Sequence, residues 1–217
     1  MELTVVSCHA EYDSKRACEE QAVLSELFSR GLDTFHLRKP TYSITEMRAW
    51  LNALPQEFHS RIVVHSFHDL AMEYALKGVH LTTRQRTKCM QSKRQIEFLM
   101  QKRPELELST SIHDLDELRF APSKYRYVFL SPLYDSISKP HYRSNFEDHE
   151  LLRSTVKMSR NHVYALGGIT SDKINEVRDL GFHGVAILGA IWRSDTPVQS
   201  FEEIQAKCQS LQNVCSA

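Results

Sequence analysis

Short apolar runs and amphipathic helical patterns alternate along the whole chain, and this order constrains the fold more than any other feature. Several of the runs are continuously apolar, as in strands of a parallel sheet that is covered on both faces. The predicted strands are residues 3–8, 33–38, 61–65, 78–82, 106–111, 127–131, 162–166 and 184–189. The predicted helices are residues 17–31, 43–54, 68–78, 90–102, 114–118, 148–158, 171–181 and 200–212.

The number of strand–helix units favours a barrel over an open sheet. Eight such units within 217 residues are typical of an α/β protein with a single (β/α)8 TIM barrel. The competing architecture, a doubly wound open sheet, usually carries a glycine-rich phosphate loop after its first strand, and residues 8–17 contain no glycine. No linker rich in glycine, serine or proline divides the chain, so we expect residues 1–217 to form one domain.

The charge and cysteine content exclude several classes of partner. The chain has 27 Lys and Arg residues and 27 Asp and Glu residues, so it has no bulk attraction for nucleic acid or for an anionic membrane. No apolar window is long enough to cross a bilayer, and no basic residue precedes the first apolar run, which indicates a strand rather than a signal peptide. The five cysteines form no CxxC pair, which indicates a reduced, cytoplasmic location.

Glycines gather near the C-terminus, where they indicate a site for an anion. Of seven glycines, five lie between residues 167 and 189. Gly167 and Gly168 follow the seventh predicted strand, and Leu188 and Gly189 end the eighth. Glycines at strand ends let backbone N–H groups point into a concavity, and the loops after strands 7 and 8 are the usual phosphate site of such barrels. The alternative is that these glycines only permit tight turns.

A second group of candidate phosphate ligands follows the sixth predicted strand. Ser136, Ser138 and Lys139 form a loop cluster in which hydroxyls donate to phosphate oxygens and the lysine supplies a positive charge. An ordinary solvated polar loop is the alternative. Arg38 and Lys39 end the second predicted strand, where each is either a structural partner of a carboxylate or a clamp for a ligand.

Three histidines lie on the same rim if the barrel prediction holds. His65, His80 and His113 end or follow the third, fourth and fifth predicted strands, with Ser111 and Ser131 at neighbouring strand ends. General acid–base catalysis is one role for these histidines, and a hydrogen-bonded structural histidine is the alternative for each. Their spacing contains neither HxH nor HExxH, so we predict no metal site among them.

Five segments of the chain resemble a known family in order and spacing. The chain is similar to the thiamine phosphate synthase and thiazole tautomerase (TenI-like) superfamily of (β/α)8 barrels. The segment from Val163 to Trp192 is the most similar. The five segments are FHLRKP, VVHSFHDLAMEYALKGVHL, STSIHDLDEL, YVFLSPLYDSISKP and VYALGGITSDKINEVRDLGFHGVAILGAIW.

The resemblance implies a transferase of thiamine biosynthesis that acts on small phosphorylated substrates. In this family a pyrimidine methyl diphosphate loses pyrophosphate with the help of Mg²⁺, and the nitrogen of a thiazole phosphate attacks the carbocation that results. At matching positions, the thiazole phosphate site comprises Gly167, Gly168, Leu188 and Gly189, the diphosphate loop comprises Ser136, Ser138 and Lys139, and Arg38, Ser111 and Ser131 complete the set.

Several positions depart from the synthase pattern. Synthases have an Asn-Asp pair after the third strand, with the aspartate on Mg²⁺, where this chain has His65 and Ser66. The second magnesium carboxylate aligns near Gln85, and the lysine after the second strand is absent or shifted to Lys39. Mg²⁺ prefers anionic oxygen ligands, so no residue is assigned to a metal, and Mg²⁺ is a cofactor only if the synthase reaction is retained.

These departures leave three functions open. The first is the synthase reaction, with Arg38 and Lys39 as candidate catalytic residues. The second is a metal-free thiazole phosphate tautomerase; the catalytic histidine of that branch falls on Pro132 here, so His65, His80 or His113 would act instead. The third is a non-catalytic binder of phosphorylated ligands. Small phosphorylated molecules are the expected partners, nucleic acid and membranes are not, and a homo-oligomer is left open.

Overall fold

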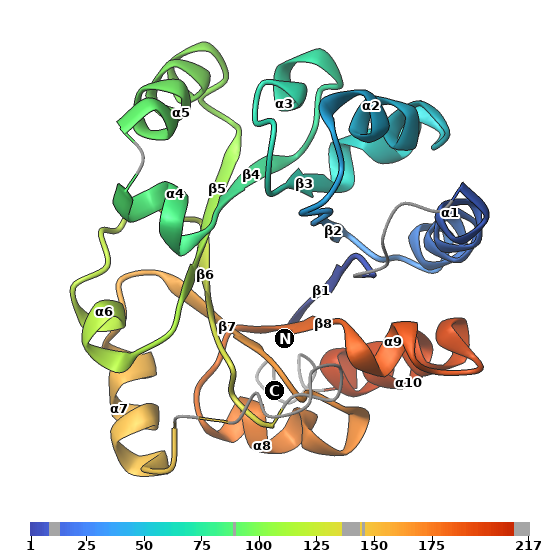
Figure 1. The fold of residues 1–217 in the computed structure, drawn as a ribbon. Helices are drawn as coiled ribbons and strands as arrows, with labels where there is room; N and C mark the ends of the chain where they lie inside the picture. The colour runs from blue at the N-terminus through green and yellow to red at the C-terminus, as the bar shows by residue number, and fades with distance from the viewer. Residues whose placement is uncertain (9–13, 89, 136–143, 145, 211–217) are drawn as a thin grey trace. The chain divides into compact units, whose positions relative to one another are not determined.

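The computed structural model describes residues 1–8, 14–88, 90–135, 144 and 146–210, and Figure 1 shows their ribbon. The strands are hydrogen-bonded in chain order and the sheet closes on itself, with parallel pairing in each strand pair whose register is described. The predicted (β/α)8 fold is confirmed. The strands are β1 (Glu2–Val6), β2 (Thr34–Leu37), β3 (Ile62–Val64), β4 (Gly78–Leu81), β5 (Glu107–Ile112), β6 (Tyr127–Leu130), β7 (His162–Leu166) and β8 (Gly184–Ile187).

Helices follow the strands, as Figure 1 shows by their labels. None of the helices in the described part of the chain combines the length and the apolar character that a membrane span requires. The α-helices are α1 (Ser14–Ser29), α2 (Ile44–Asn52), α3 (Leu70–Glu73), α4 (Thr83–Lys88), α5 (Met90–Lys102), α6 (Leu115–Arg119), α7 (His149–Met158), α8 (Ile174–Asp179), α9 (Gly189–Trp192) and α10 (Pro197–Ser210), and the 3-10 helices are η1 (Gln56–Arg61) and η2 (Ser171–Lys173).

Several predicted elements have other bounds in the structure, and three of these differences have a clear local cause. The predicted strand 184–189 is too long, because β8 ends at Ile187 and Gly189 begins α9. The predicted helix 68–78 shrinks to the single turn of α3, since Ala75 adopts a left-handed φ of 50°. The predicted helix 171–181 is divided into η2 and the six residues of α8.

Helix α4 was not predicted, and its origin is a capping box. The Gln85 side chain accepts a hydrogen bond from the Thr82 amide at 2.8 Å, and the Gln85 amide donates to Thr82 Oγ1 at 3.4 Å. These two reciprocal bonds satisfy amides that a helix start leaves without intrahelical partners.

The described chain forms two compact units, residues 1–5 with 111–217 and residues 6–110, and each is described by itself. In the second unit, Phe35 of β2 stacks on Trp50 of α2 at a centroid distance of 5.9 Å and meets Phe28 of α1 edge-on at 6.4 Å. Because side chains alternate between the two faces of a strand, His36 points to the face opposite the one that carries Phe35. The aromatic packing of α1 and α2 thus directs His36 away from the helices.

In the other unit, β6, β7 and β8 are neighbouring parallel strands of the sheet. Tyr127 of β6 stacks on Tyr164 of β7 at 4.5 Å, and the register sets Leu166 of β7 opposite Ala186 of β8. This register brings the loops that follow β7 and β8 to the same edge of the sheet.

Candidate active site

Three histidines come together in the unit of residues 6–110. His36 lies in β2, His65 follows β3 and His80 lies in β4. The Nδ1 atom of His36 and the Nε2 atom of His65 share a hydrogen bond of 2.8 Å, and the rings of His65 and His80 stack with centroids 4.1 Å apart. One ring nitrogen from each histidine lies within 4.8 Å of the others, and all three side chains are buried. We call His36, His65 and His80 the histidine cluster.

Neighbouring groups fix the orientation of the histidine cluster. The Nδ1 atom of His80 shares a hydrogen bond of 2.9 Å with the Ser109 hydroxyl, and the register pairs the same two residues across β4 and β5. The side-chain amide of Gln85 donates to the carbonyl of His65 at 3.1 Å. The first contact orients the His80 ring, and the second fixes the backbone of His65.

The surroundings keep the histidine cluster uncharged at neutral pH. Burial lowers the pKa of His36 to about 3, with a further lowering from the Lys77 charge. Burial also holds the pKa of His65 well below its ordinary value, and His80, His36 and Arg38 lower it further. The pKa of His80 is held well below its ordinary value in the same way. Each neutral imidazole therefore offers one unprotonated nitrogen as an acceptor or ligand.

Arg38 and Lys39 have different surroundings. The Lys39 ammonium lies 2.6 Å from the Glu20 carboxylate and donates to the Cys8 carbonyl at 2.9 Å, with 3% of the residue exposed. Of the two interpretations of Lys39, this geometry favours the carboxylate partner. Arg38 is half-buried, and burial lowers the pKa of its guanidinium. Ser7 fixes its backbone through hydrogen bonds with its amide and its carbonyl.

The residues at the ends of β3 and β4 do not fit a magnesium site. The positions at which the resemblance implies carboxylates hold Ser66 and Gln85. Gln85 uses its amide nitrogen to donate to the His65 carbonyl, which a carboxylate could not do. Asp69 is the only carboxylate within residues 65–69 and 82–88, and it is exposed and accepts a hydrogen bond from Gln95 at 2.6 Å. Mg²⁺ binds through carboxylate oxygens and water, so no step is assigned to it here.

The unit with β6–β8 carries the glycines that the sequence associated with phosphate. Gly167 and Gly168 follow β7 with left-handed φ values of 104° and 65°. Leu188 and Gly189 follow β8, and all four residues are half-buried. Within the described ranges, the amide N–H groups of Gly168 and Gly189 donate to no hydrogen-bond acceptor. Amides of this kind at adjacent strand ends can receive an anion.

The same glycines also allow the loop after β6 to pack closely. The amide of Tyr134 donates to the Gly167 carbonyl at 3.1 Å. A Cβ atom on Gly168 would overlap the Asp135 carbonyl and would lie 2.7 Å from Tyr134 Cβ, while one on Gly167 would lie 2.9 Å from Pro132 Cα. This close packing supports the tight-turn interpretation, because a side chain at Gly167 or Gly168 would collide with the loop after β6. The N–H group of Gly168 nevertheless stays available for an anion.

Gly168→Ala should destabilise the protein by about 3 kcal/mol, because it adds left-handed strain to an overlap with backbone. Gly181→Ala is the matched control: its φ of 93° carries the strain, but the nearest atom to the new Cβ would be in the flexible Lys157 side chain, at 3.3 Å, with Val156 Cγ1 at an ordinary contact distance of 3.9 Å. We expect about 1–2 kcal/mol there. Urea unfolding of both variants measures the difference, and equal losses would show that the loop after β6 does not require Gly168.

Lys173 lies beside the glycine pair and was not found by sequence reasoning. Its ammonium donates to the Gly168 carbonyl at 3.3 Å and lies 4.1 Å from the centre of the Tyr134 ring. Its position in the sequence could have indicated this role, because a lysine in the first turn after the Gly-Gly pair lies close to the backbone amides of that pair. His36 lies within the segment FHLRKP, but no role in the site was assigned to it from the sequence.

The remaining site residues predicted from the sequence lie outside the histidine cluster, in different parts of the chain. His113 is exposed and belongs to the unit with β6–β8, where its Nδ1 donates to the Ser131 carbonyl at 2.8 Å. It is therefore not a member of the histidine cluster. Ser111 is half-buried in β5. Ser136, Ser138 and Lys139 lie outside the described residues.

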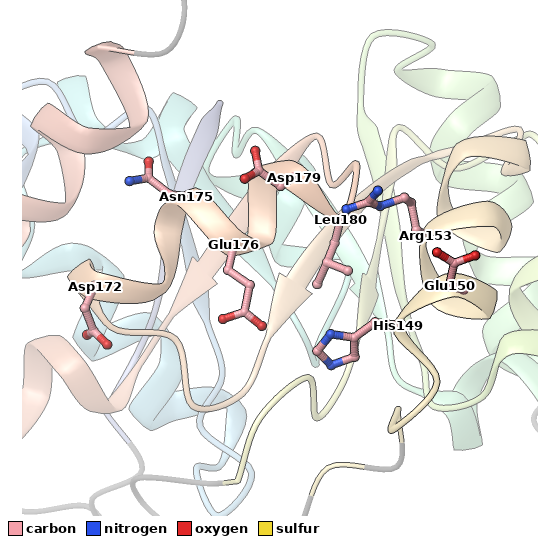
Figure 2. A pocket seen from close by; sticks show the side chains of 8 residues that line it. All are labelled: His149, Glu150, Arg153, Asp172, Asn175, Glu176, Asp179 and Leu180. Carbon is pink, nitrogen blue, oxygen red and sulfur yellow. The ribbon is translucent and has the colours of Figure 1, made fainter.

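A surface pocket of about 520 Å³ lies on α7, η2 and α8, and it holds none of the sequence-predicted site residues. Figure 2 shows its lining side chains, with His149, Glu150 and Arg153 from α7 and the others from η2 and α8 or just beyond. Four of the lining residues are carboxylates, namely Glu150, Asp172, Glu176 and Asp179. Their negative charge disfavours a phosphorylated ligand, so this pocket is not the candidate site.

Comparisons with known proteins identify one family. A family model described as "Thiamine monophosphate synthase" matches residues 4–191. The thiamine-phosphate synthase of Lysinibacillus sphaericus is 28% identical over 189 residues, which cover 82% of this chain and 83% of that protein. The thiamine-phosphate synthase of Serratia proteamaculans is 26% identical, and the alignment covers 85% of this chain and 87% of that protein.

Solved structures give the same result. The thiamine phosphate pyrophosphorylase of Bacteroides thetaiotaomicron has a TM-score of 0.74 and 27% identity, and the alignment covers 96% of this chain and 98% of that chain. The thiamine phosphate pyrophosphorylase of Pyrococcus furiosus has the same TM-score at 22% identity and covers 96% of each chain. At that lower identity the likeness supports the fold alone.

Proposed function

The chain belongs to the thiamine monophosphate synthase family, an enzyme family of thiamine biosynthesis, and we propose that it joins a pyrimidine methyl diphosphate to a thiazole phosphate. The family match confirms the resemblance drawn from the sequence. In the proposed reaction the bond between the methylene carbon and the diphosphate oxygen breaks, and pyrophosphate leaves with the electron pair. The lone pair of the thiazole nitrogen then forms the new carbon–nitrogen bond.

One observation carries the proposal: amides without acceptors lie at two adjacent strand ends. Gly168 and Gly189 are half-buried, and their N–H groups donate to no acceptor within the described residues. Hydrogen bonds from N–H groups to an anionic oxygen are stronger than bonds between neutral groups, so a phosphate ester suits this edge. We assign the thiazole phosphate to Gly167, Gly168, Leu188 and Gly189, with Lys173 adding positive charge nearby.

The diphosphate is assigned to cationic and hydroxyl groups. Ser136, Ser138 and Lys139 are proposed as its ligands, on the sequence pattern alone. Arg38 is proposed to face the leaving group, because a guanidinium forms two parallel hydrogen bonds to a phosphate. Lys39 is not assigned to the diphosphate, since its ammonium is already bound by Glu20 and the Cys8 carbonyl.

A metal-free thiazole phosphate tautomerase is the second candidate, and the histidine cluster favours it. A tautomerase moves a proton on one phosphorylated substrate and needs no leaving group. His65 and His80 are neutral imidazoles, and a neutral imidazole accepts a proton as a general base. Nδ1 of His65 is buried and has no hydrogen-bond partner within the described residues.

Two measurements on one sample separate these candidates. The protein is incubated in D2O-containing buffer with the thiazole phosphate, with and without the pyrimidine methyl diphosphate. The proposal predicts thiamine phosphate and pyrophosphate in equal amounts only when both substrates are present. Deuterium incorporation into the thiazole phosphate alone would establish the tautomerase, and binding of both substrates without either change would establish a non-catalytic binder.

A further inference from the structure

The histidine cluster has the composition of a metal site, although no spacing along the chain predicts one. We propose that His36, His65 and His80 bind a divalent transition-metal ion, with Zn²⁺ and Co²⁺ as the best-suited ions. Three buried side chains each present one nitrogen, and these nitrogens lie within 4.8 Å of one another. The ligands come from β2, the end of β3 and β4, so the chain folding itself creates the set.

The donor chemistry selects the class of ion. Three imidazoles with a fourth position left for water or a ligand are a known zinc arrangement. Nitrogen ligands suit Zn²⁺, Co²⁺ and Ni²⁺, whereas Mg²⁺ requires oxygen ligands. A bound metal also requires neutral imidazoles, and all three side chains are buried, which disfavours their charged form. The three imidazoles therefore favour a transition metal over Mg²⁺.

Coordination of one ion requires the rings to rearrange: the His36–His65 pair must separate slightly, and the stacked His65 and His80 rings must tilt toward a common centre. Zinc–nitrogen bonds of about 2.0–2.1 Å in a tetrahedron place the nitrogens about 3.3 Å apart. The facing nitrogens of His36 and His65 are already 2.8 Å apart and share one proton. If His36 Nδ1 and His65 Nε2 both coordinate the metal, their hydrogen bond is lost. The proton then moves to the other nitrogen of the ring that donated it. For His65 that nitrogen is Nδ1, the buried atom without a partner within the described residues.

Groups around the cluster supply the support that metal ligands usually have. Metal-bound histidines orient through a hydrogen bond on the second ring nitrogen, and the His80 Nδ1 contact with Ser109 at 2.9 Å provides this bond. The Gln85 amide fixes the backbone of His65. Arg38 and Lys77 oppose a cation by their charge, and among the residues that the structure describes no carboxylate joins the three histidines. The site should therefore bind the metal together with an anionic fourth ligand, such as hydroxide or a phosphate oxygen.

Cobalt titration of the full-length protein tests the proposal without any thiamine precursor. The protein is freed of metal by chelation, titrated with Co²⁺ and followed by visible absorption. One equivalent of Co²⁺ should produce d–d bands, and Zn²⁺ should remove them while excess Mg²⁺ does not. His65→Ala should weaken Co²⁺ binding by about 100-fold or more. His162→Asn is the matched control, since His162 stacks on His183 at 4.5 Å as an exposed pair, and it should bind Co²⁺ as the parent does.

Contrary results are equally clear. Absence of the bands, retention of the bands in His65→Ala, or their loss in His162→Asn would overturn the proposal. If His65→Ala does not fold, X-ray absorption spectroscopy of the parent protein with one equivalent of Zn²⁺ decides the question. Three imidazole ligands support the site, and sulfur ligands would place the ion on cysteines instead. The proposal stands apart from the proposed function, because metal binding is measured in the absence of both substrates.

Discussion

Lowering the pH from 7 to 5 should destabilise the metal-free protein by about 2 kcal/mol through His36, with a further loss from His65 and His80. The histidine cluster is the cause. Burial lowers the pKa of His36 to about 3 and holds those of His65 and His80 well below the ordinary value of 6.5. The unfolded chain therefore takes up protons below pH 6.5 that the folded chain cannot accept.

The sign of the effect follows from proton linkage. Where the unfolded state binds more protons, the free energy of unfolding rises with pH. The stabilisation is complete above the unfolded pKa of 6.5 and is lost as the pH falls from there toward 3. His36, with a folded pKa of about 3, contributes about 2 kcal/mol between pH 7 and 5, and His65 and His80 lower the stability further in the same direction.

Urea unfolding at pH 7, 6 and 5, with a chelator present, measures this dependence. His36→Gln should reduce the loss between pH 7 and 5 by about 2 kcal/mol, because the contribution of that histidine is removed. A parent protein whose stability is the same at pH 5 and pH 7 would contradict the buried, neutral state of the cluster.

Glu20→Ala should destabilise the protein by about 3–5 kcal/mol, because it leaves the Lys39 ammonium buried without its counter-charge. The Glu20 carboxylate lies 2.6 Å from that ammonium, accepts from the Cys8 amide at 2.7 Å and accepts from the Trp50 indole at 3.3 Å. The single substitution therefore removes three contacts in a site from which water is excluded.

Two further variants serve as controls for the Glu20→Ala prediction. Glu26→Ala removes the carboxylate of an exposed pair with Arg30, at 3.3 Å, and should cost less than about 0.5 kcal/mol. The double variant Glu20→Leu, Lys39→Met should recover much of the lost stability, since it leaves no unpaired charge. A Glu20→Ala loss no larger than that of Glu26→Ala, measured by urea unfolding at pH 7, would show that Lys39 reaches solvent or another partner.

Local patterns were sufficient to predict the architecture. The predicted strand 162–166 and the predicted helix 90–102 coincide with β7 and α5. The prediction succeeds because the apolar residues that recur with a regular period in the sequence form the buried face of the element in the structure. Boundaries failed where a single backbone conformation decides them. Ala75 in a left-handed conformation ends α3 early, and no side-chain pattern encodes that angle.

The candidate site was less accessible to sequence reasoning, because its members meet only through strand register. His36, His65 and His80 have no metal-ligand spacing along the chain, yet β2, β3 and β4 bring them together. Lys39 illustrates the same limit. Its sequence position left a clamp and an ion-pair partner open, and the packing of α1, which places Glu20 at 2.6 Å, favours the second.

The central claim is that backbone amides at the ends of β7 and β8 hold a phosphate ester, and titration calorimetry tests it most directly. The protein is titrated with the thiazole phosphate and, separately, with the corresponding thiazole alcohol, which differs only in the phosphate. Strong charge-assisted hydrogen bonds to the ester predict that the phosphate binds about 100-fold more tightly than the alcohol. Equal affinity for the two compounds, or no binding of either, would contradict the account.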